Sequence, residues 1–279
     1  MTDTRAKLTF IGTGNMAGAI IGGLLDNGYP AERIIGTTRS EQSAQTAAST
    51  YGIHVTTDND AAISDADVII LGVKPQVMKD TCAAISSAVQ AQKPLVVSVA
   101  AGIEAATLDQ WLGTGLAVIR CMPNTPSLLG TGISGLYANA AVTDTQRDLV
   151  DTMFRSVGIT QWVHNEADMH TITAICGSAP AYFYRFSEAL VRSAEQRGLS
   201  PESARQLVSQ VALGAARMLS ETGETPAELR QKVSSPGGTT VEALRVFDQQ
   251  GLDDLVEAAV AACFNRSVSL TEELANPKE

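Results

Sequence analysis

Residues 7–25 read KLTFIGTGNMAGAIIGGLL and join two apolar runs through a glycine-rich turn. The first run, 7–12, has the length and composition of a short buried strand, and the second, 18–25, is typical of a helix. Between them Gly12, Gly14 and Ala17 fit the pattern G-x-G-x-x-[GA]. Its glycines permit a tight turn and let a pyrophosphate approach the start of the helix. This order of strand, turn and helix predicts a dinucleotide-binding domain.

Strand-like and helix-like segments alternate through the following hundred or so residues. The strand candidates are short and rich in Val, Ile and Leu, as buried strands are. Such alternation predicts an α/β fold with a doubly wound, parallel, Rossmann-type sheet and helices on both faces. Further strands are expected at 33–38, 54–56, 68–72, 95–99, 117–122 and 132–137, and helices at 41–51, 76–89 and 104–112.

The last part of the chain is helical, so we expect a Rossmann-type domain over 1–163 and an all-helical domain over 164–279. Helix starts are marked by Ser200-Pro201-Glu202 and by Thr225 with Glu228 three residues later. The helix expected at 252–274 carries Ala and Val on more than one face. Such a helix needs partners on more than one side, which predicts a homodimer or a higher homo-oligomer.

The end of the second strand, Gly36 to Ser40, indicates which cofactor binds. An NAD site usually has Asp or Glu there to bind the ribose 2′-hydroxyl, and this segment has none. Arg39 can pair with a 2′-phosphate, and Thr38 and Ser40 can donate hydrogen bonds to it. These residues favour NADPH, with NADH as the weaker alternative. In the competing interpretation Arg39 is an ordinary surface cation and Glu41 binds the ribose.

Three more loops follow strand ends, where open α/β sheets bind ligands. They are Val73-Lys74-Pro75, Ser98 to Gly102, and Arg120 to Pro126, where the Asn124 amide could hold a carboxamide. Together they predict a floor for the nicotinamide. The predicted cofactor-binding residues are Gly12, Thr13, Gly14, Asn15, Met16, Ala17, Thr38, Arg39, Ser40, Val73, Lys74, Pro75, Ala100, Met122, Pro123 and Asn124.

A second glycine-rich turn, Ser234 to Thr240 (SSPGGTT), lies between two helical stretches. Proline fixes φ at the start of the turn, and the two glycines adopt conformations closed to other residues. The turn would aim N–H groups and hydroxyls at one point at a helix N-terminus, which suits a small carboxylate. In the alternative interpretation Thr239 or Thr240 merely caps the helix.

Several motifs, taken in order along the chain, resemble the pyrroline-5-carboxylate reductase family. That resemblance implies NAD(P)H-dependent reduction of (S)-1-pyrroline-5-carboxylate to L-proline, the last step of proline synthesis. It also implies a Rossmann domain followed by a helical dimerisation domain, in a homodimer or homodecamer. The motifs are the glycine turn at 10–17, Val73-Lys74-Pro75, Met122 to Pro126, Gly177 to Tyr182 and Ser235 to Thr240.

The resemblance also implies roles for the second turn, which would bind substrate through Ser235, Gly237, Gly238, Thr239 and Thr240. Ser235 and the backbone amides of Thr239 and Thr240 would hold the carboxylate. The Thr240 hydroxyl would hydrogen-bond the ring nitrogen, so Thr240 and Ser235 are the expected catalytic residues. One departure is that Ala179 stands where the family usually has the second glycine of Gly-Ser-Gly-Pro-Ala. We expect its methyl group to tighten packing without abolishing the site.

The composition argues against other classes of protein. Asp and Glu number 30 against 20 Lys and Arg, whereas a nucleic-acid surface needs clustered positive charge. No apolar run approaches the ~20 residues of a membrane span, and the N-terminus lacks a signal-peptide pattern. We therefore expect a cytoplasmic protein with no membrane or nucleic-acid partner and no metal. The cysteines are expected to be reduced core residues, and they are Cys82, Cys121, Cys176 and Cys263.

Two rival functions share the same scaffold. An NADP-linked reductase of the β-hydroxyacid dehydrogenase type usually needs a catalytic lysine on a C-terminal helix, but only Lys232 and Lys278 follow residue 170. Lys74 keeps this rival open as a possible proton relay. A non-catalytic nucleotide-sensing protein would retain Gly12 and Gly14 but need not retain Ser235 and Thr240 together. Imine reduction needs no strong general acid, so the three histidines are expected to be structural.

Overall fold

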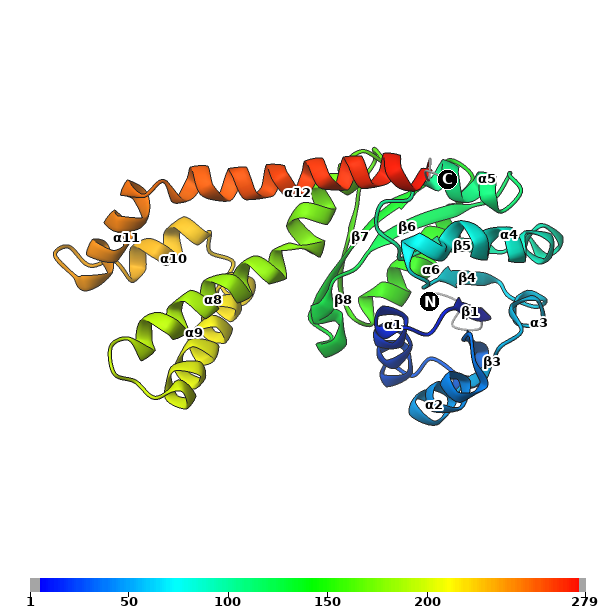
Figure 1. Ribbon diagram of the computed structural model, residues 1–279, viewed down its shortest axis with the longest axis horizontal. Coiled ribbons are helices and arrows are strands. Elements are labelled where there is room, and N and C mark those ends of the chain that lie inside the picture. Colours follow the sequence, from blue (N-terminus) through cyan, green and yellow to red (C-terminus); the bar gives the residue numbers. More distant parts are fainter. Residues whose placement is uncertain (1–5, 276–279) are drawn as a thin grey trace. The chain divides into compact units, whose positions relative to one another are not determined.

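The computed structural model describes residues 6–275, and its contacts divide the chain into two units. Within the described residues, the first unit spans 6–178 and 263–275, and the second spans 179–262. Figure 1 shows the sheet and its helices in the first unit and a bundle of helices in the second. Among the described residues no helix is long and apolar enough to cross a membrane.

The first unit is built on one eight-stranded sheet in the order β3-β2-β1-β4-β5-β6-β7-β8. Neighbouring strands are parallel except for β6 and β7, which are antiparallel. The predicted all-parallel sheet is therefore wrong at this pair. Only residues 123–131 join the two strands, and a parallel crossover needs a longer connection. The strands are β1 (Leu8–Ile11), β2 (Ile34–Thr37), β3 (His54–Thr56), β4 (Val68–Leu71), β5 (Leu95–Ser98), β6 (Val118–Met122), β7 (Gly132–Ala138) and β8 (Gly158–Trp162).

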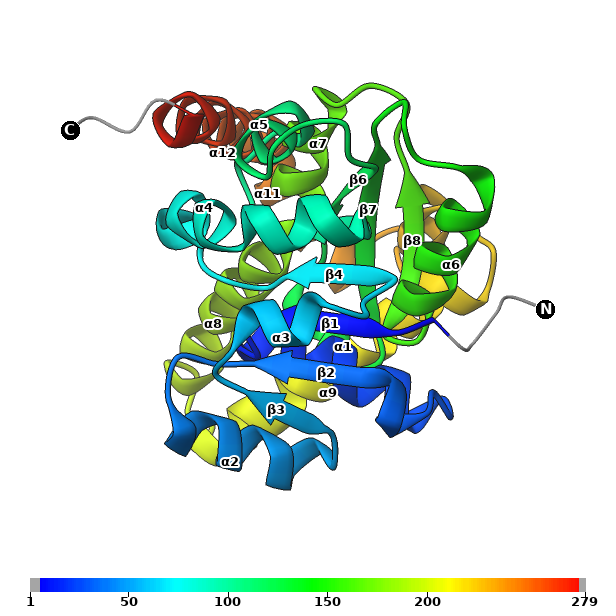
Figure 2. The same ribbon diagram turned by 90° about the vertical axis from the view of Figure 1, so that its right-hand side faces the viewer.

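Helices cover both faces of this sheet, as Figure 2 shows. Side chains alternate along each strand, so β4 directs Val68 and Ile70 into one apolar cluster and Ile69 and Leu71 into the other. The helices are α1 (Asn15–Asp26), α2 (Glu41–Tyr51), α3 (Asn59–Ile63), α4 (Pro75–Gln92), α5 (Ala105–Trp111), α6 (Asp144–Arg155) and α7 (Asp168–Ile172), with short 3₁₀ turns η1 (Ala31–Arg33) and η2 (Thr125–Leu129). The doubly wound architecture predicted from the sequence is confirmed.

The chain returns to the first unit through the end of helix α12 (Leu252–Ala275). There the His170 ring meets Ser267 at 2.9 Å and packs edge-on against Phe264. The buried Arg120 guanidinium pairs with Glu166 at 2.9 Å, just before α7. Through these contacts residues 164–178 and the end of α12 pack with the sheet. The division predicted from the sequence had placed all of 164–279 in the helical domain.

A π-helix, η3 (Thr173–Gly177), connects α7 to the second unit. Its widened turn is marked by the Ser178 N–H, which donates to the Thr173 carbonyl at 3.0 Å. The second unit then contains α8 (Ala179–Glu195), α9 (Pro201–Glu221), α10 (Pro226–Lys232), α11 (Thr239–Gln249) and the first part of α12.

The second unit buries very little of its own apolar surface. Among its residues Ala204 is the one fully buried hydrophobic side chain. Large apolar side chains remain exposed along its helices, including Phe183 at 68%, Val211 at 64% and Leu255 at 66%. Soluble single chains rarely leave so large an apolar surface uncovered, and such surfaces mark protein–protein contacts. These helices therefore require a covering surface from outside the unit.

Candidate functional site

The glycine turn after β1 has a backbone that only glycine tolerates at its first position. Gly12 has φ +91°, and a Cβ there would lie 2.9 Å from Val73 Cγ1. Thr13 continues the turn through its N–H, which donates to the Thr37 carbonyl at 3.1 Å. The turn is thus held between the ends of β2 and β4, at the edge of the sheet where a dinucleotide is predicted to bind.

The start of α1 is open to an anion. Gly14 is its N-cap and forms no side-chain cap, and no acidic residue lies in the first turn. A Cβ built on Gly14 would meet no protein atom within 4 Å, so the free space lies on the outer side of the turn. Asn15 beside it is exposed. Unpaired N–H groups at a helix N-terminus attract phosphate, so these residues fit a pyrophosphate.

Two residues of the fingerprint serve packing. Ala17 is fully buried, and a Cβ on Gly72 would lie 3.1 Å from its methyl group. The small side chain keeps α1 close to the end of β4. Met16 is partly buried against the larger apolar cluster. Ala17 therefore shapes the turn from beneath and presents no side chain at its surface.

The loop after β2 presents one exposed cation, Arg39. The Thr38 hydroxyl donates to the Ser40 carbonyl at 3.1 Å, and Ser40 caps α2 by accepting from the Ser43 N–H. Both hydroxyls therefore have partners near the loop, and Ser40 supplies the N-cap that the start of α2 needs. The predicted role of Thr38 and Ser40 as phosphate donors stays a prediction. Arg39 is the exposed cation of this loop, and its charge suits a 2′-phosphate.

Glu41, the alternative ribose ligand, is already engaged. Its Oε1 accepts from the Thr57 hydroxyl at 2.7 Å, which ties the start of α2 to the loop after β3. A carboxylate held in this way is less free to accept from a ribose. This geometry favours the interpretation in which Arg39 selects the cofactor.

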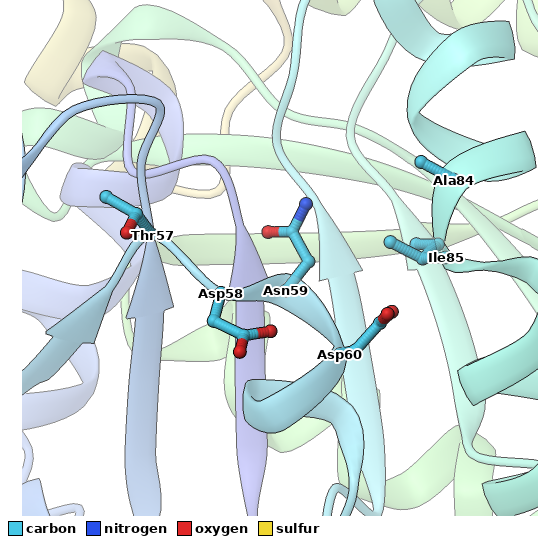
Figure 3. Close-up of a pocket in the computed structure, with 6 residues that line it drawn as sticks. All are labelled: Thr57, Asp58, Asn59, Asp60, Ala84 and Ile85. Atoms are coloured by element: carbon cyan, nitrogen blue, oxygen red, sulfur yellow. The ribbon is translucent and has the colours of Figure 1, made fainter.

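A pocket of about 390 Å³ opens beside the same loop, as Figure 3 shows. Asp58 caps α3 by accepting from the Ala61 N–H at 3.0 Å, and Asn59 begins that helix. No sequence motif had singled out these residues, since loops after short strands carry no fixed pattern. The pocket is lined by Thr57, Asp58, Asn59, Asp60, Ala84 and Ile85.

The other predicted loops follow β4, β5 and β6, which are adjacent and parallel, so their carboxyl ends share one edge. Lys74 is exposed and is the N-cap of α4, and Pro75 is the first residue of that helix. Ala100 is nearly buried, and its N–H donates to the Ser98 hydroxyl at 3.3 Å. This edge therefore brings together the three segments that the sequence assigned to the nicotinamide.

The Asn124 amide is bound to backbone groups of the protein. The side chain is 7% exposed, its Oδ1 accepts from the Ile133 N–H at 3.0 Å, and its Nδ2 donates to the Cys176 carbonyl at 3.1 Å. Each amide atom therefore has a protein partner, and the predicted contact with a carboxamide stays a prediction. Both amide atoms are satisfied by backbone from β7 and η3.

Burial shifts the pKa values of several titratable groups in the first unit. Burial raises the pKa of the Cys82 thiol to about 12 and also raises those of Cys121 and Cys176. Burial lowers the pKa of His170 below its usual value, with Arg120 contributing. Over residues 6–275 no three His, Cys, Asp or Glu side chains gather as metal ligands do.

The second glycine-rich turn lies in the second unit, between α10 and α11. The Gly238 N–H donates to the Ser235 carbonyl at 2.9 Å, and Gly237 has φ +73°. Pro236 and Gly237 thus occupy the central positions of a type II turn. A Cβ on Gly238 would lie 2.9 Å from the Ser235 carbonyl oxygen. Each glycine is therefore required for a different physical reason.

The structure does not support the interpretation of Thr239 and Thr240 as helix caps. Gly238 is the N-cap of α11, with no side-chain cap, and the two threonines are the first helical residues. Thr239 is exposed and Thr240 is partly buried. The N-terminal N–H groups of an eleven-residue helix are thus left without a side-chain acceptor. The hydroxyls of Thr239 and Thr240 and these N–H groups are suited to binding a small anion.

Two family models match the chain. Residues 7–102 match the family described as NADP oxidoreductase, coenzyme F420-dependent, and residues 166–270 match pyrroline-5-carboxylate reductase dimerisation. The second match covers the helices whose apolar side chains lie exposed. It supports the prediction of a homo-oligomer. It also explains why apolar side chains are exposed on these helices, since a second subunit would cover them.

Relatives match over almost the whole chain. A Pseudomonas aeruginosa pyrroline-5-carboxylate reductase is 44% identical over 96% of this chain and 98% of its own, and the Escherichia coli enzyme is 36% identical over 95% and 98%. A solved Coxiella burnetii pyrroline-5-carboxylate reductase superimposes with a TM-score of 0.91 at 41% identity, over 96% and 99% of the two chains. The Plasmodium falciparum enzyme, solved with NADP bound, gives 0.84 at 27% identity over 97% and 99%. The chain therefore belongs to the pyrroline-5-carboxylate reductase family, as its motifs predicted.

Proposed function

We propose that this protein reduces (S)-1-pyrroline-5-carboxylate to L-proline, with NADPH as the hydride donor. The observation that carries the proposal is the type II turn at Ser235–Gly238, which delivers an uncapped helix N-terminus and the Thr240 hydroxyl to one place. A cyclic imino acid has the matching groups, a carboxylate and a ring nitrogen next to each other.

The residues fit the cofactor at three points: the open face of Gly14, the uncapped start of α1 and the exposed Arg39. The amides after Gly14 hold the pyrophosphate, and Arg39 pairs with the 2′-phosphate. The pocket beside Asn59 adjoins the loop after β2 through the Thr57–Glu41 hydrogen bond and takes the adenine. NADPH supplies a hydride when bound, and the remaining chemistry belongs to the protein and solvent.

The turn performs three tasks in this reaction. The amides of Thr239 and Thr240 and the Ser235 hydroxyl bind the carboxylate and orient the ring. The Thr240 hydroxyl hydrogen-bonds the ring nitrogen, which gains a proton from water as its double bond to carbon is reduced. No strong acid is needed because the imine is already electrophilic, so the task is mainly one of orientation.

The test is an absorbance assay at the nicotinamide band with purified protein and pyrroline-5-carboxylate. We expect NADPH to be consumed only when the imine is present, with one proline formed per NADPH, and NADH to be used less well. A parallel assay with 3-hydroxy acids and NADP⁺ addresses the rival dehydrogenase. Oxidation of a 3-hydroxy acid by NADP⁺, together with no reduction of the imine by NADPH, would reject the proposal.

Arg39→Ala should shift the cofactor preference. An exposed arginine–phosphate pair contributes about 1.5 kcal/mol, so the ratio of NADPH to NADH affinity should fall about tenfold. Titration of each cofactor by tryptophan quenching measures that ratio. Arg33→Ala, at the opposite end of β2, is the matched control and should leave the ratio unchanged. An equal loss for both cofactors in Arg39→Ala would contradict the 2′-phosphate assignment.

We further propose that the homo-oligomer contains dimers joined through the helices of the second unit. Val211→Asp places a charge on the exposed apolar surface of α9, where burying an unpaired carboxylate in an interface is strongly unfavourable. Sedimentation should show smaller species. The dissociation constant of the oligomer should rise at least tenfold. Gln45→Asp, on the exposed face of α2 in the other unit, adds the same charge and should not alter assembly. Unchanged assembly of Val211→Asp would place the interface elsewhere.

A further inference from the structure

Asn124 follows β6 and lies two residues beyond Met122, in a loop that the sequence assigned to the nicotinamide. Its side chain is almost fully buried and turned away from the surface. The amide joins three segments, because it accepts from Ile133 at the start of β7 and donates to Cys176 in η3. These two hydrogen bonds hold the backbone of the loop that carries Asn124 in place.

The carbonyl of Cys176 has a specific need for this donor. In an α-helix that carbonyl would accept from the N–H of residue 180, and residue 180 is a proline without an N–H. The π-helical register of η3 accompanies this break. The Nδ2 of Asn124 supplies the missing donor at 3.1 Å. The hydrogen bond from Asn124 in the loop after β6 therefore satisfies a carbonyl at the end of η3 that lacks its α-helical donor.

The same stretch of η3 also supports Met122. A Cβ built on Gly177 would lie 2.3 Å from Met122 Cε, so the methionine tip rests directly on the glycine backbone. Gly177 follows Cys176, so the loop is held at two successive residues of η3. One contact is a hydrogen bond from Asn124, and the other is van der Waals contact through Met122.

We propose that Asn124 is a positioning residue that sets Met122 and Pro123 at the height needed for productive hydride transfer. The inference rests on the proposed reductase function, but its structural part does not. Each amide atom of Asn124 already has a protein partner, and the residue is 7% exposed. It acts through the loop, and a small displacement of such a loop lowers the rate of the chemical step more than it weakens binding.

Asn124→Asp is the most discriminating variant. It keeps the oxygen that accepts from Ile133 and replaces the donor by an oxygen facing the Cys176 carbonyl. We expect kcat to fall about 10²-fold, the loss associated with misplacement by about 1 Å, while KM for NADPH changes less than about threefold. Gly177→Ala should displace the Met122 tip and also lower kcat. The double variant should lose less than the product of the two single losses, because both substitutions displace the same loop.

Asn139 provides a matched control at the opposite end of β6. Its Oδ1 accepts from the Val118 N–H at 3.1 Å and its Nδ2 donates to the Leu116 carbonyl at 2.9 Å. Asn139→Asp makes the same chemical change and should lower the melting temperature while retaining the kcat of the unmodified protein. A loss of kcat in Asn139→Asp equal to that in Asn124→Asp would overturn the proposal, and so would an unchanged kcat in Asn124→Asp.

Hydrogen exchange of the protein without cofactor tests the structural part separately. Asn124→Asp should raise exchange in peptides covering 122–133 and 173–178, whereas Asn139→Asp should raise it only around 116–118. Unchanged exchange at 122–133 in Asn124→Asp would overturn the proposal even if activity were lost. If the unmodified protein does not reduce the imine, the proposed function fails, and this exchange result still decides whether Asn124 fixes the loop.

Discussion

Gly14→Val is expected to abolish cofactor binding and leave the fold intact. A Cβ on Gly14 would meet no atom beyond its own neighbours in the chain within 4 Å, so the protein has room for the added side chain. The pyrophosphate would then be kept from the amides, and hydrogen bonds to a charged group contribute about 1.5–3 kcal/mol each. Losing two of them weakens NADPH and NADH alike by at least about 10²-fold, and fluorescence titration of both cofactors measures this.

Gly22→Val is the control for Gly14→Val. Gly22 lies on the same helix, and a Cβ there also meets no protein atom within 4 Å. This variant should bind both cofactors normally, with a melting temperature close to that of Gly14→Val. Normal cofactor titration of Gly14→Val would mean that the glycine turn is not a dinucleotide site. Loss of the helical circular-dichroism signal in Gly14→Val, but not in Gly22→Val, would instead show that Gly14 is needed for folding.

Thr240→Ala should lower turnover by about 10²-fold, while NADPH still binds with its normal affinity. Removing one hydrogen bond that strengthens in the transition state costs about 2.7 kcal/mol or more. The change is local because Thr240 is the second residue of α11, where Ala is a better helix former. Steady-state kinetics with saturating NADPH measures the loss.

Two further variants isolate the hydroxyl of Thr240. Thr240→Ser keeps the oxygen and should recover most of the turnover. Thr239→Ala removes the neighbouring hydroxyl but keeps the backbone amide, so it should stay within about threefold of the unmodified protein. If Thr240→Ala turned over normally, the ring nitrogen would have to be supported by some other group.

Much of the fold could be predicted because local patterns and tertiary structure agree. The β-branched runs at β4 and β5 have the continuous apolar character of strands buried on both faces, and α9 and α10 begin at the predicted caps Ser200 and Thr225. Neither α6 nor β8 was predicted, because the polar surface of α6 masks its apolar face and β8 alternates over too few residues. The reversed direction of β7 was predictable, because the segment between the two predicted strands is too short for a parallel crossover.

The two glycine-rich turns were predictable for a related reason. Gly12 and Gly237 have positive φ, and this requirement is visible in the residue itself. Asn124 shows the limit of such reasoning. An amide after a strand suggests a ligand contact, but its partners at Ile133 and Cys176 are 9 and 52 residues away in sequence. Only the folded chain shows that these backbone groups need it.

The path of α12 has a consequence for anyone who dissects this protein. Its Leu270 and Leu274 lie against Gly102, so the nucleotide-binding half is completed by the last turns of the chain. In topological terms the helical bundle is an insertion within a discontinuous domain. A chimera that exchanges bundles between relatives therefore needs two junctions, near 178 and 263, and a fragment cut after the first junction would lack part of its own core.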